Sequence, residues 1–185
     1  MRTYRRSLLC LGLILFCNST GTIAGNDETS GNDMNPKALL YNISTQGAKT
    51  VAIRLYADPK SWDYVLHQIA TGKESWLKVA VALHPGTDAG SREMLSLAVG
   101  EALESSPENV FRIALPEYQM VYICDGPDVD DARYDSYELS MKAIKRRQDR
   151  VAAISDPALM TIGKKCLQEL ERSKSEIAEF YGVRN

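Results

Sequence analysis

Residues 134–181 read YDSYELSMKAIKRRQDRVAAISDPALMTIGKKCLQELERSKSEIAEFY, and this stretch decides the fold. Apolar residues recur along it at steps of three and four, which places them on one face of a helix. Asp156-Pro157 divides the pattern, because aspartate caps a helix N-terminus and proline suits the first helical position. We therefore expect two antiparallel helices that share an apolar seam. The first contributes Tyr134, Tyr137, Met141, Ile144, Gln148 and Val151, and the second Leu159, Ile162, Gly163, Cys166, Leu170, Ile177 and Phe180.

Helical signals continue through the preceding hundred residues. A capping residue followed by proline recurs at Asp58-Pro59, Ser106-Pro107 and Asp156-Pro157. Gly72 stands where a glycine commonly ends a helix. The apolar run 76–83 reads as a buried helix, although its valines also suit a strand. We expect an all-α domain, arranged as a bundle or a short solenoid-like stack of αα-hairpins.

The N-terminal residues carry the features of a secretory signal. Arg2, Arg5 and Arg6 precede an apolar run of ten residues that is too short to span a bilayer. Small residues Thr22 and Ala24 favour cleavage before Gly25. We expect a signal peptide at 1–24, a disordered leader at 25–35 and a single helical domain at 36–185, in the periplasm or secreted. No later stretch is apolar enough for a membrane span.

The cysteine pattern fits that compartment. Cys10 and Cys17 belong to the expected signal peptide, which leaves Cys124 and Cys166. An even number of cysteines in an oxidising compartment favours a disulfide between them. The alternative, a reactive or metal-binding pair, has no histidine near either cysteine in the sequence.

Charge limits the classes of partner. Three of the 22 basic residues and none of the 24 acidic residues lie in the signal, so the mature chain has a formal charge of −5. Nucleic acids and anionic membranes need basic clusters and are disfavoured as partners. A basic protein partner fits, although mild acidity is also common for solubility alone.

The densest group of carboxylates lies between Cys124 and the expected hairpin. An EF-hand loop that begins at Asp128 would need a glycine at its sixth position and a glutamate at its twelfth. This chain has Arg133 and Leu139 at those positions. Turn formation next to a helix N-terminus explains the acids in ordinary terms, and an irregular calcium site remains an alternative. We expect a contact surface for a basic partner, made by Asp128, Asp130, Asp131, Tyr134 and Asp135.

Catalytic motifs are sparse. Ser75-Trp76-Leu77-Lys78 matches S-x-x-K, but the partner motifs of penicillin-recognising enzymes are missing from the sequence, and such a match arises by chance. His67 reads as a boundary residue of a helix, and His84 as a cap before a turn. No motif indicates a cofactor or a structural metal.

One part of the chain resembles a known group. The residues Trp76 to Ala80, Leu83, Pro85 to Gly90, Ala102-Leu103 and Pro107 are similar to a pattern in small, uncharacterised exported helical proteins of Gram-negative bacteria. The similarity covers roughly residues 58–170. It implies a helical fold and a periplasmic address, and it brings no catalytic residue and no ligand.

These features favour a periplasmic, non-catalytic protein-interaction module. A more specific hypothesis is an inhibitor or immunity-type protein. Its partner would be another envelope or secreted protein. The alternatives are an envelope enzyme, marked by a cleft with converging titratable groups, and a small-ligand carrier, marked by an enclosed apolar cavity.

Overall fold

The computed structural model describes residues 34–183, and this part of the chain is helical without a strand. Its helices are α1 (Pro36–Gln46), α2 (Ala48–Tyr56), α3 (Pro59–Ala70), α4 (Glu74–Leu83), α5 (Ala89–Glu101), α6 (Pro107–Asn109), α7 (Met120–Ile123), α8 (Tyr137–Ala152) and α9 (Pro157–Phe180). The all-α class is confirmed, and the ambiguous run 76–83 is helical within α4. The expected signal peptide and most of the leader, residues 1–33, lie outside the described residues.

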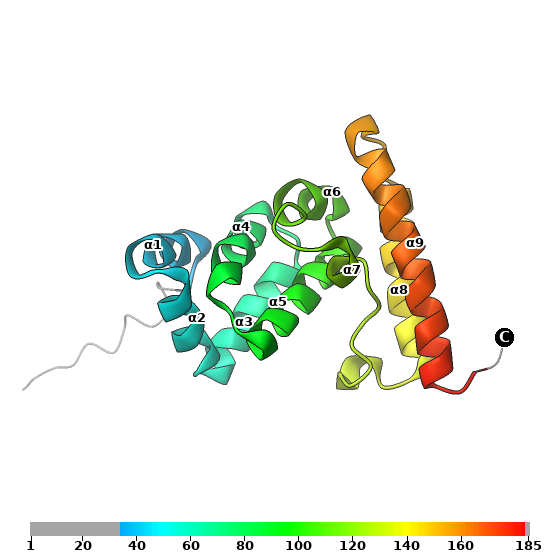
Figure 1. The fold of residues 1–185 in the computed structure, drawn as a ribbon, viewed down its shortest axis with the longest axis horizontal. Coiled ribbons are helices and arrows are strands. Elements are labelled where there is room, and N and C mark those ends of the chain that lie inside the picture. Colours follow the sequence, from blue (N-terminus) through cyan, green and yellow to red (C-terminus); the bar gives the residue numbers. More distant parts are fainter. Residues whose placement is uncertain (1–33, 184–185) are drawn as a thin grey trace, which may run out of the picture.

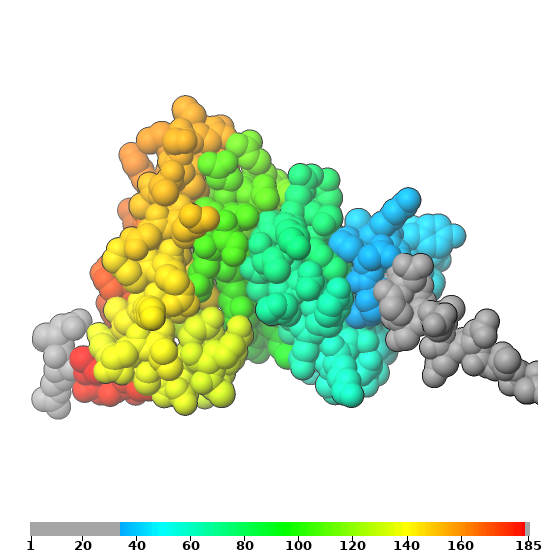
Figure 2. Space-filling model, turned by 180° about the vertical axis from the view of Figure 1, so that it is seen from behind, coloured from blue at the N-terminus to red at the C-terminus, as the bar shows by residue number. Residues whose placement is uncertain are grey.

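The helices form two groups, α1–α7 and the hairpin α8–α9, which meet where the 3₁₀ helix Ala102–Glu104, α6 and α7 contact the hairpin. In Figure 1, α8 and α9 stand as an antiparallel hairpin at one end, and α1 and α2 lie at the other. Figure 2 shows the same order from behind, with the green middle segments between the hairpin and the blue N-terminal helices. Among the preceding helices α1 packs on α4, α3 on α5, and α5 on α7. One apolar core, which includes Leu77, Leu103 and Ile144, runs through both groups.

Helix starts follow the capping residues. Each of the three cap-plus-proline pairs opens a helix at its proline: α3, α6 and α9. Only Asp156 uses its side chain as a cap there, accepting from the Ala158 amide at 2.9 Å. Asn35, at the end of the expected leader, caps α1 through the Ala38 amide. These caps satisfy amides that have no partner inside the helix.

Two glycines permit close turns. Gly72 follows α3 with a φ of 69°, a left-handed conformation in which glycine is favoured, as the sequence predicted. A Cβ at Gly86 would lie 2.2 Å from the carbonyl carbon of Ala48. The turn after α4 can therefore rest directly on the start of α2 only because residue 86 has no side chain.

The predicted seam of the closing hairpin is confirmed, but three residues assigned to it have a different position or exposure. Tyr134 precedes α8 in a 3₁₀ turn rather than lying within the helix. Arg147 is buried with 2% of its surface exposed, and the expected Gln148 is only half-buried. Phe180 is 62% exposed, because Ile177 and Ala178 take the buried positions of the last turn.

The segment before the hairpin contains a turn and a single-turn helix. Pro116 lies in the turn, and α7 starts at Met120. The hydroxyl of Tyr118 donates to the carbonyl of Ala80 at 3.0 Å, which holds this turn against α4. In the single-turn helix that follows, Ile123 is buried and Tyr122 is 57% exposed.

A disulfide joins the two groups of helices. Cys124 follows α7, Cys166 lies in the middle of α9, and both are fully buried. Their Cα atoms are 5.2 Å apart, so the predicted pairing is confirmed. None of the helices within residues 34–183 is sufficiently long and apolar to cross a membrane.

Replacing both cysteines, Cys124→Ala with Cys166→Ala, is expected to lower the free energy of unfolding by about 4 kcal/mol. The bond closes a loop across a sequence separation of 42 residues, and losing it increases the conformational entropy of the unfolded chain. Urea unfolding followed by circular dichroism measures the change. Reductant should destabilise the native protein and leave the variant unaffected; a loss below about 1 kcal/mol would contradict this role of the bond.

Candidate functional site

The predicted contact residues lie in the segment 125–135 between α7 and α8, which we call the acidic turn. Its first residue is held from two sides: Arg147 Nη1 donates to the Asp125 carbonyl at 2.7 Å, and the Ser173 hydroxyl donates to the Asp125 carboxylate. At its other end the Tyr134 carbonyl accepts from the hydroxyls of Ser140 and Tyr181, each at 3.0 Å. The disulfide at Cys124 adds a covalent anchor directly before the turn. The turn is therefore attached at both ends to the closing hairpin.

The five predicted residues differ in their exposure. Asp130 and Asp135 are exposed, and Asp128 is half-buried with one oxygen, Oδ1, accepting from the Asp130 amide at 2.9 Å. Asp131 is half-buried in an ion pair. Tyr134 is buried, and burial raises the pKa of its phenol. The turn therefore presents carboxylates to solvent, whereas the tyrosine ring contributes chiefly to holding the turn in place.

Arg133 fastens the turn to α5. Its guanidinium binds Glu101 with two hydrogen bonds, Nη2 to Oε1 at 2.6 Å and Nη1 to Oε2 at 3.1 Å. The same group reaches Asp131 through Nε and Nη2, at 3.0 and 2.6 Å from Oδ2. These hydrogen bonds lower the pKa of Asp131, since they favour its ionised form. One basic side chain thus pairs with two carboxylates and sets the position of the turn.

Arg147 is the site residue that sequence reasoning missed. Its Nε lies 3.5 Å from Glu104 Oε1 as an ion pair, but neither of these two atoms has a hydrogen-bond partner. The other oxygen of Glu104 accepts from Arg146. A three-residue step from Ile144 reaches position 147 just as a four-residue step reaches 148, so the helical period alone did not separate the two residues.

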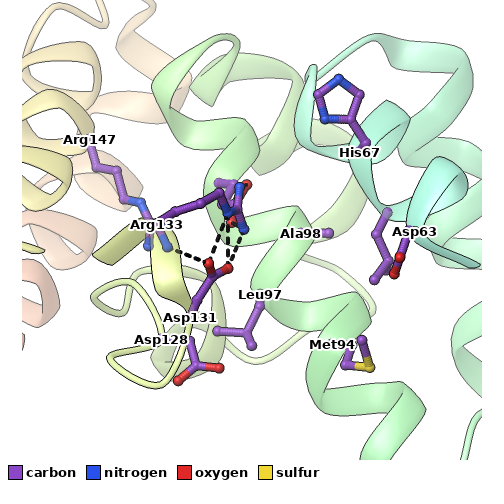
Figure 3. Close-up of a pocket in the computed structure, with 11 residues that line it drawn as sticks. Asp63, His67, Met94, Leu97, Ala98, Asp128, Asp131, Arg133 and Arg147 are labelled. Carbon is purple, nitrogen blue, oxygen red and sulfur yellow. Dashed lines mark hydrogen bonds and ion pairs between the residues drawn. The ribbon is translucent and has the colours of Figure 1, made fainter. Parts of the chain in front are cut away.

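A pocket of about 400 Å³ lies between α3, α5 and the acidic turn. Figure 3 shows Asp63 and His67 on one side, the turn residues Asp128, Asp131 and Arg133 on the other, and α5 between them. Its apolar wall consists of Leu66, Met94, Leu97 and Ala98, and its remaining lining residues are Glu101 and Arg147. The volume falls within the usual range for ligand sites. Two of the predicted acids, Asp128 and Asp131, therefore border a concave surface.

A second pocket, of about 460 Å³, lies on the other side of Leu97. In it His84 Nδ1 is 2.9 Å from Glu117 Oε1, and the imidazole lies against the Tyr118 ring with 4.4 Å between centroids. Burial raises the pKa of Tyr118. The sequence had placed His84 as a helix cap, and it does end α4, but its pairing with Glu117 joins residues 33 positions apart and had no local signal.

The possible nucleophile motif has no catalytic geometry. Ser75 and Lys78 are both exposed on α4, and Lys78 Nζ pairs with Glu74 Oε1 at 2.6 Å. No group of three or more His, Cys, Asp or Glu side chains suited to a metal ion occurs in the described part of the chain. The surface around the acidic turn therefore remains the best-defined candidate for function.

No protein-family model, curated protein or solved structure matches the chain. The resemblance to exported helical proteins stays a prediction.

Replacing Arg133 with glutamine is expected to raise the pKa of Asp131 toward its ordinary value. Because the folded state lowers this pKa, the ionised carboxylate stabilises the turn at neutral pH, and that contribution is lost as the pH falls through the lowered pKa. The carboxyl carbon shift of Asp131, followed by NMR against pH, measures the change. Asp88, whose pKa is lowered by hydrogen bonds from Ser91, is the internal control and should not respond. An unchanged titration of Asp131 would show that Arg133 does not hold it.

Proposed function

We propose that this protein is a periplasmic or secreted, non-catalytic binding module that engages a basic protein through its acidic turn. The observation that carries the proposal is the anchoring of the turn. Cys124, directly before it, is disulfide-bonded to Cys166; the start of the turn is bound to Arg147 and Ser173, and its end to Ser140 and Tyr181. A preformed surface loses less conformational entropy on binding than a flexible one. A rigid acidic contact surface is thus suited to recognition.

Charge and exposure support the choice of a basic partner. Asp130 and Asp135 are exposed, and neither carboxylate has a cationic partner within residues 34–183. Complementary charge on a partner would raise the association rate. This electrostatic attraction would weaken with added salt. An inhibitor or immunity-type protein, which occupies a functional surface of its target, is the finer form of this proposal.

An envelope enzyme is the second candidate, and one observation favours it. The Glu117 carboxylate binds one imidazole nitrogen of His84 at the edge of a pocket, an arrangement that can orient a general base. The binding function ranks first because the described residues place no nucleophile in hydrogen-bond contact with His84. A His84→Gln variant separates the two, since it should abolish turnover by an enzyme and leave partner capture unchanged.

Reversing three charges, Asp128→Lys, Asp130→Lys and Asp135→Lys, is expected to reduce capture of a specific partner at least about tenfold, since several rim charges change sign together. Asp131 is left intact because it holds Arg133. Tagged mature protein is incubated with the envelope fraction, and retained proteins are quantified by mass spectrometry. The control variant changes the net charge equally at exposed positions away from the turn, Asp58→Lys, Glu74→Lys and Asp149→Lys. Equal capture by both variants, or no specifically retained protein, would contradict the proposal.

A further inference from the structure

We infer that the pocket between α3, α5 and the acidic turn receives an arginine side chain of the partner protein. The inference rests on the proposed function and names the chemistry that this surface recognises. An arginine has a long apolar stem and a charged end. The pocket combines the matching parts, an apolar wall on α3 and α5 and carboxylates on two sides (Figure 3).

The apolar wall is suited to the stem of such a side chain. Leu66, Met94 and Leu97 line the pocket and are each only half-buried, so apolar surface remains open inside it. Covering this surface with methylene groups is favourable at roughly 25 cal/mol per Å². A small inorganic cation would leave the wall exposed, whereas an arginine stem covers it.

The charge left over in the pocket is negative. Four carboxylates and two guanidinium groups line it. Arg133 is engaged by Glu101 and Asp131, and the ion pair of Arg147 is with Glu104. The Asp63 side chain is exposed and makes no hydrogen bond or ion pair within residues 34–183, and the only hydrogen bond of the Asp128 carboxylate there comes from the Asp130 amide. Two lining carboxylates therefore have no cation.

Arg133 shows how this lining binds a guanidinium. It contacts both oxygens of Glu101 and both oxygens of Asp131, so the carboxylates surround the planar group on two sides. Such paired contacts match guanidinium geometry and cannot be reproduced by the compact ammonium of lysine. The pocket therefore favours a second arginine over lysine at its unpaired carboxylates.

The position of the pocket makes a protein the source of this arginine. Asp128 belongs both to the lining and to the acidic turn, so the pocket continues directly into the proposed contact surface. Arginine is among the residues that contribute most to protein interfaces when it fills a pocket at their centre. A partner bound on the turn would bring its own basic surface over the mouth of the pocket.

The test uses N-acetyl-arginine N-methylamide as the probe and the methyl NMR signals of the full mature protein as the readout. We expect saturable shifts at Leu66 and Met94, with a dissociation constant on the order of millimolar for so small a ligand. The lysine analogue should bind more weakly, and the norleucine and glutamate analogues should leave these signals unchanged. Asp63→Asn and Asp128→Asn should each weaken binding about threefold, the range expected for a part-exposed ion pair.

Several results would overturn the inference. Leu97 lines both pockets, so a shift at Leu97 without Leu66 and Met94 would place the probe in the pocket of His84. Equal or tighter binding of the lysine, norleucine or glutamate analogue would contradict guanidinium recognition, as would no shift at all. Glu93→Gln, in the second pocket, is the matched control and should not weaken binding.

This test and the partner-capture test fail separately. If the probe binds but the charge-reversed variant captures its partner as well as native protein does, the pocket binds a guanidinium and the proposed function is wrong. If capture is reduced but the probe does not bind, the proposed function is supported and the arginine pocket is wrong.

Discussion

A single buried guanidinium, that of Arg147, connects the parts of this structure on which the candidate site depends. It comes from the inner face of α8, donates to the carbonyl of Asp125 at the start of the acidic turn, and pairs with Glu104 after α5. Burying a charge is costly unless it is paired and hydrogen-bonded, so the three elements must meet closely for the fold to form. Cys124, which precedes Asp125, places the disulfide beside the same junction.

This junction explains why an acidic segment keeps a defined conformation. Several carboxylates close together repel one another, and a loop with no regular structure has little intrinsic stability. Here Arg133 pairs with both Asp131 and Glu101, which reduces their repulsion, and the carbonyl at each end of the turn accepts a hydrogen bond from the hairpin. The remaining carboxylates can then face solvent and the pocket without unfolding the segment.

Local patterns were sufficient for the helices and for the disulfide. The cap-plus-proline pairs and the apolar period predicted α9 from Pro157, and the parity of the cysteines predicted Cys124–Cys166. The exposure of Phe180 and Tyr122 could not be predicted, because helical spacing identifies a face but not the residue at which packing ends.

The candidate site could be predicted only in part from the sequence, for a related reason. The acids of the turn are adjacent in sequence, so they could be grouped. The groups that anchor the turn come from elsewhere: Glu101 on α5 binds Arg133, and Arg147 on α8 donates to the Asp125 carbonyl. An arginine in a polar stretch is typical of a surface position. The pocket wall combines residues about thirty positions apart on α3 and α5, and only the tertiary fold brings these together.

We infer that Arg147 holds the acidic turn in the conformation seen in the structure. Amide hydrogen exchange of native protein and an Arg147→Met variant, which keeps the apolar stem, tests this most directly. Protection in each protein is expressed relative to the slowest amides of α4. We expect the variant to lose protection selectively within residues 125–134, where the Tyr134 amide donates to the Asp131 carbonyl. Unchanged protection of the turn, or an equal loss throughout the protein, would contradict it.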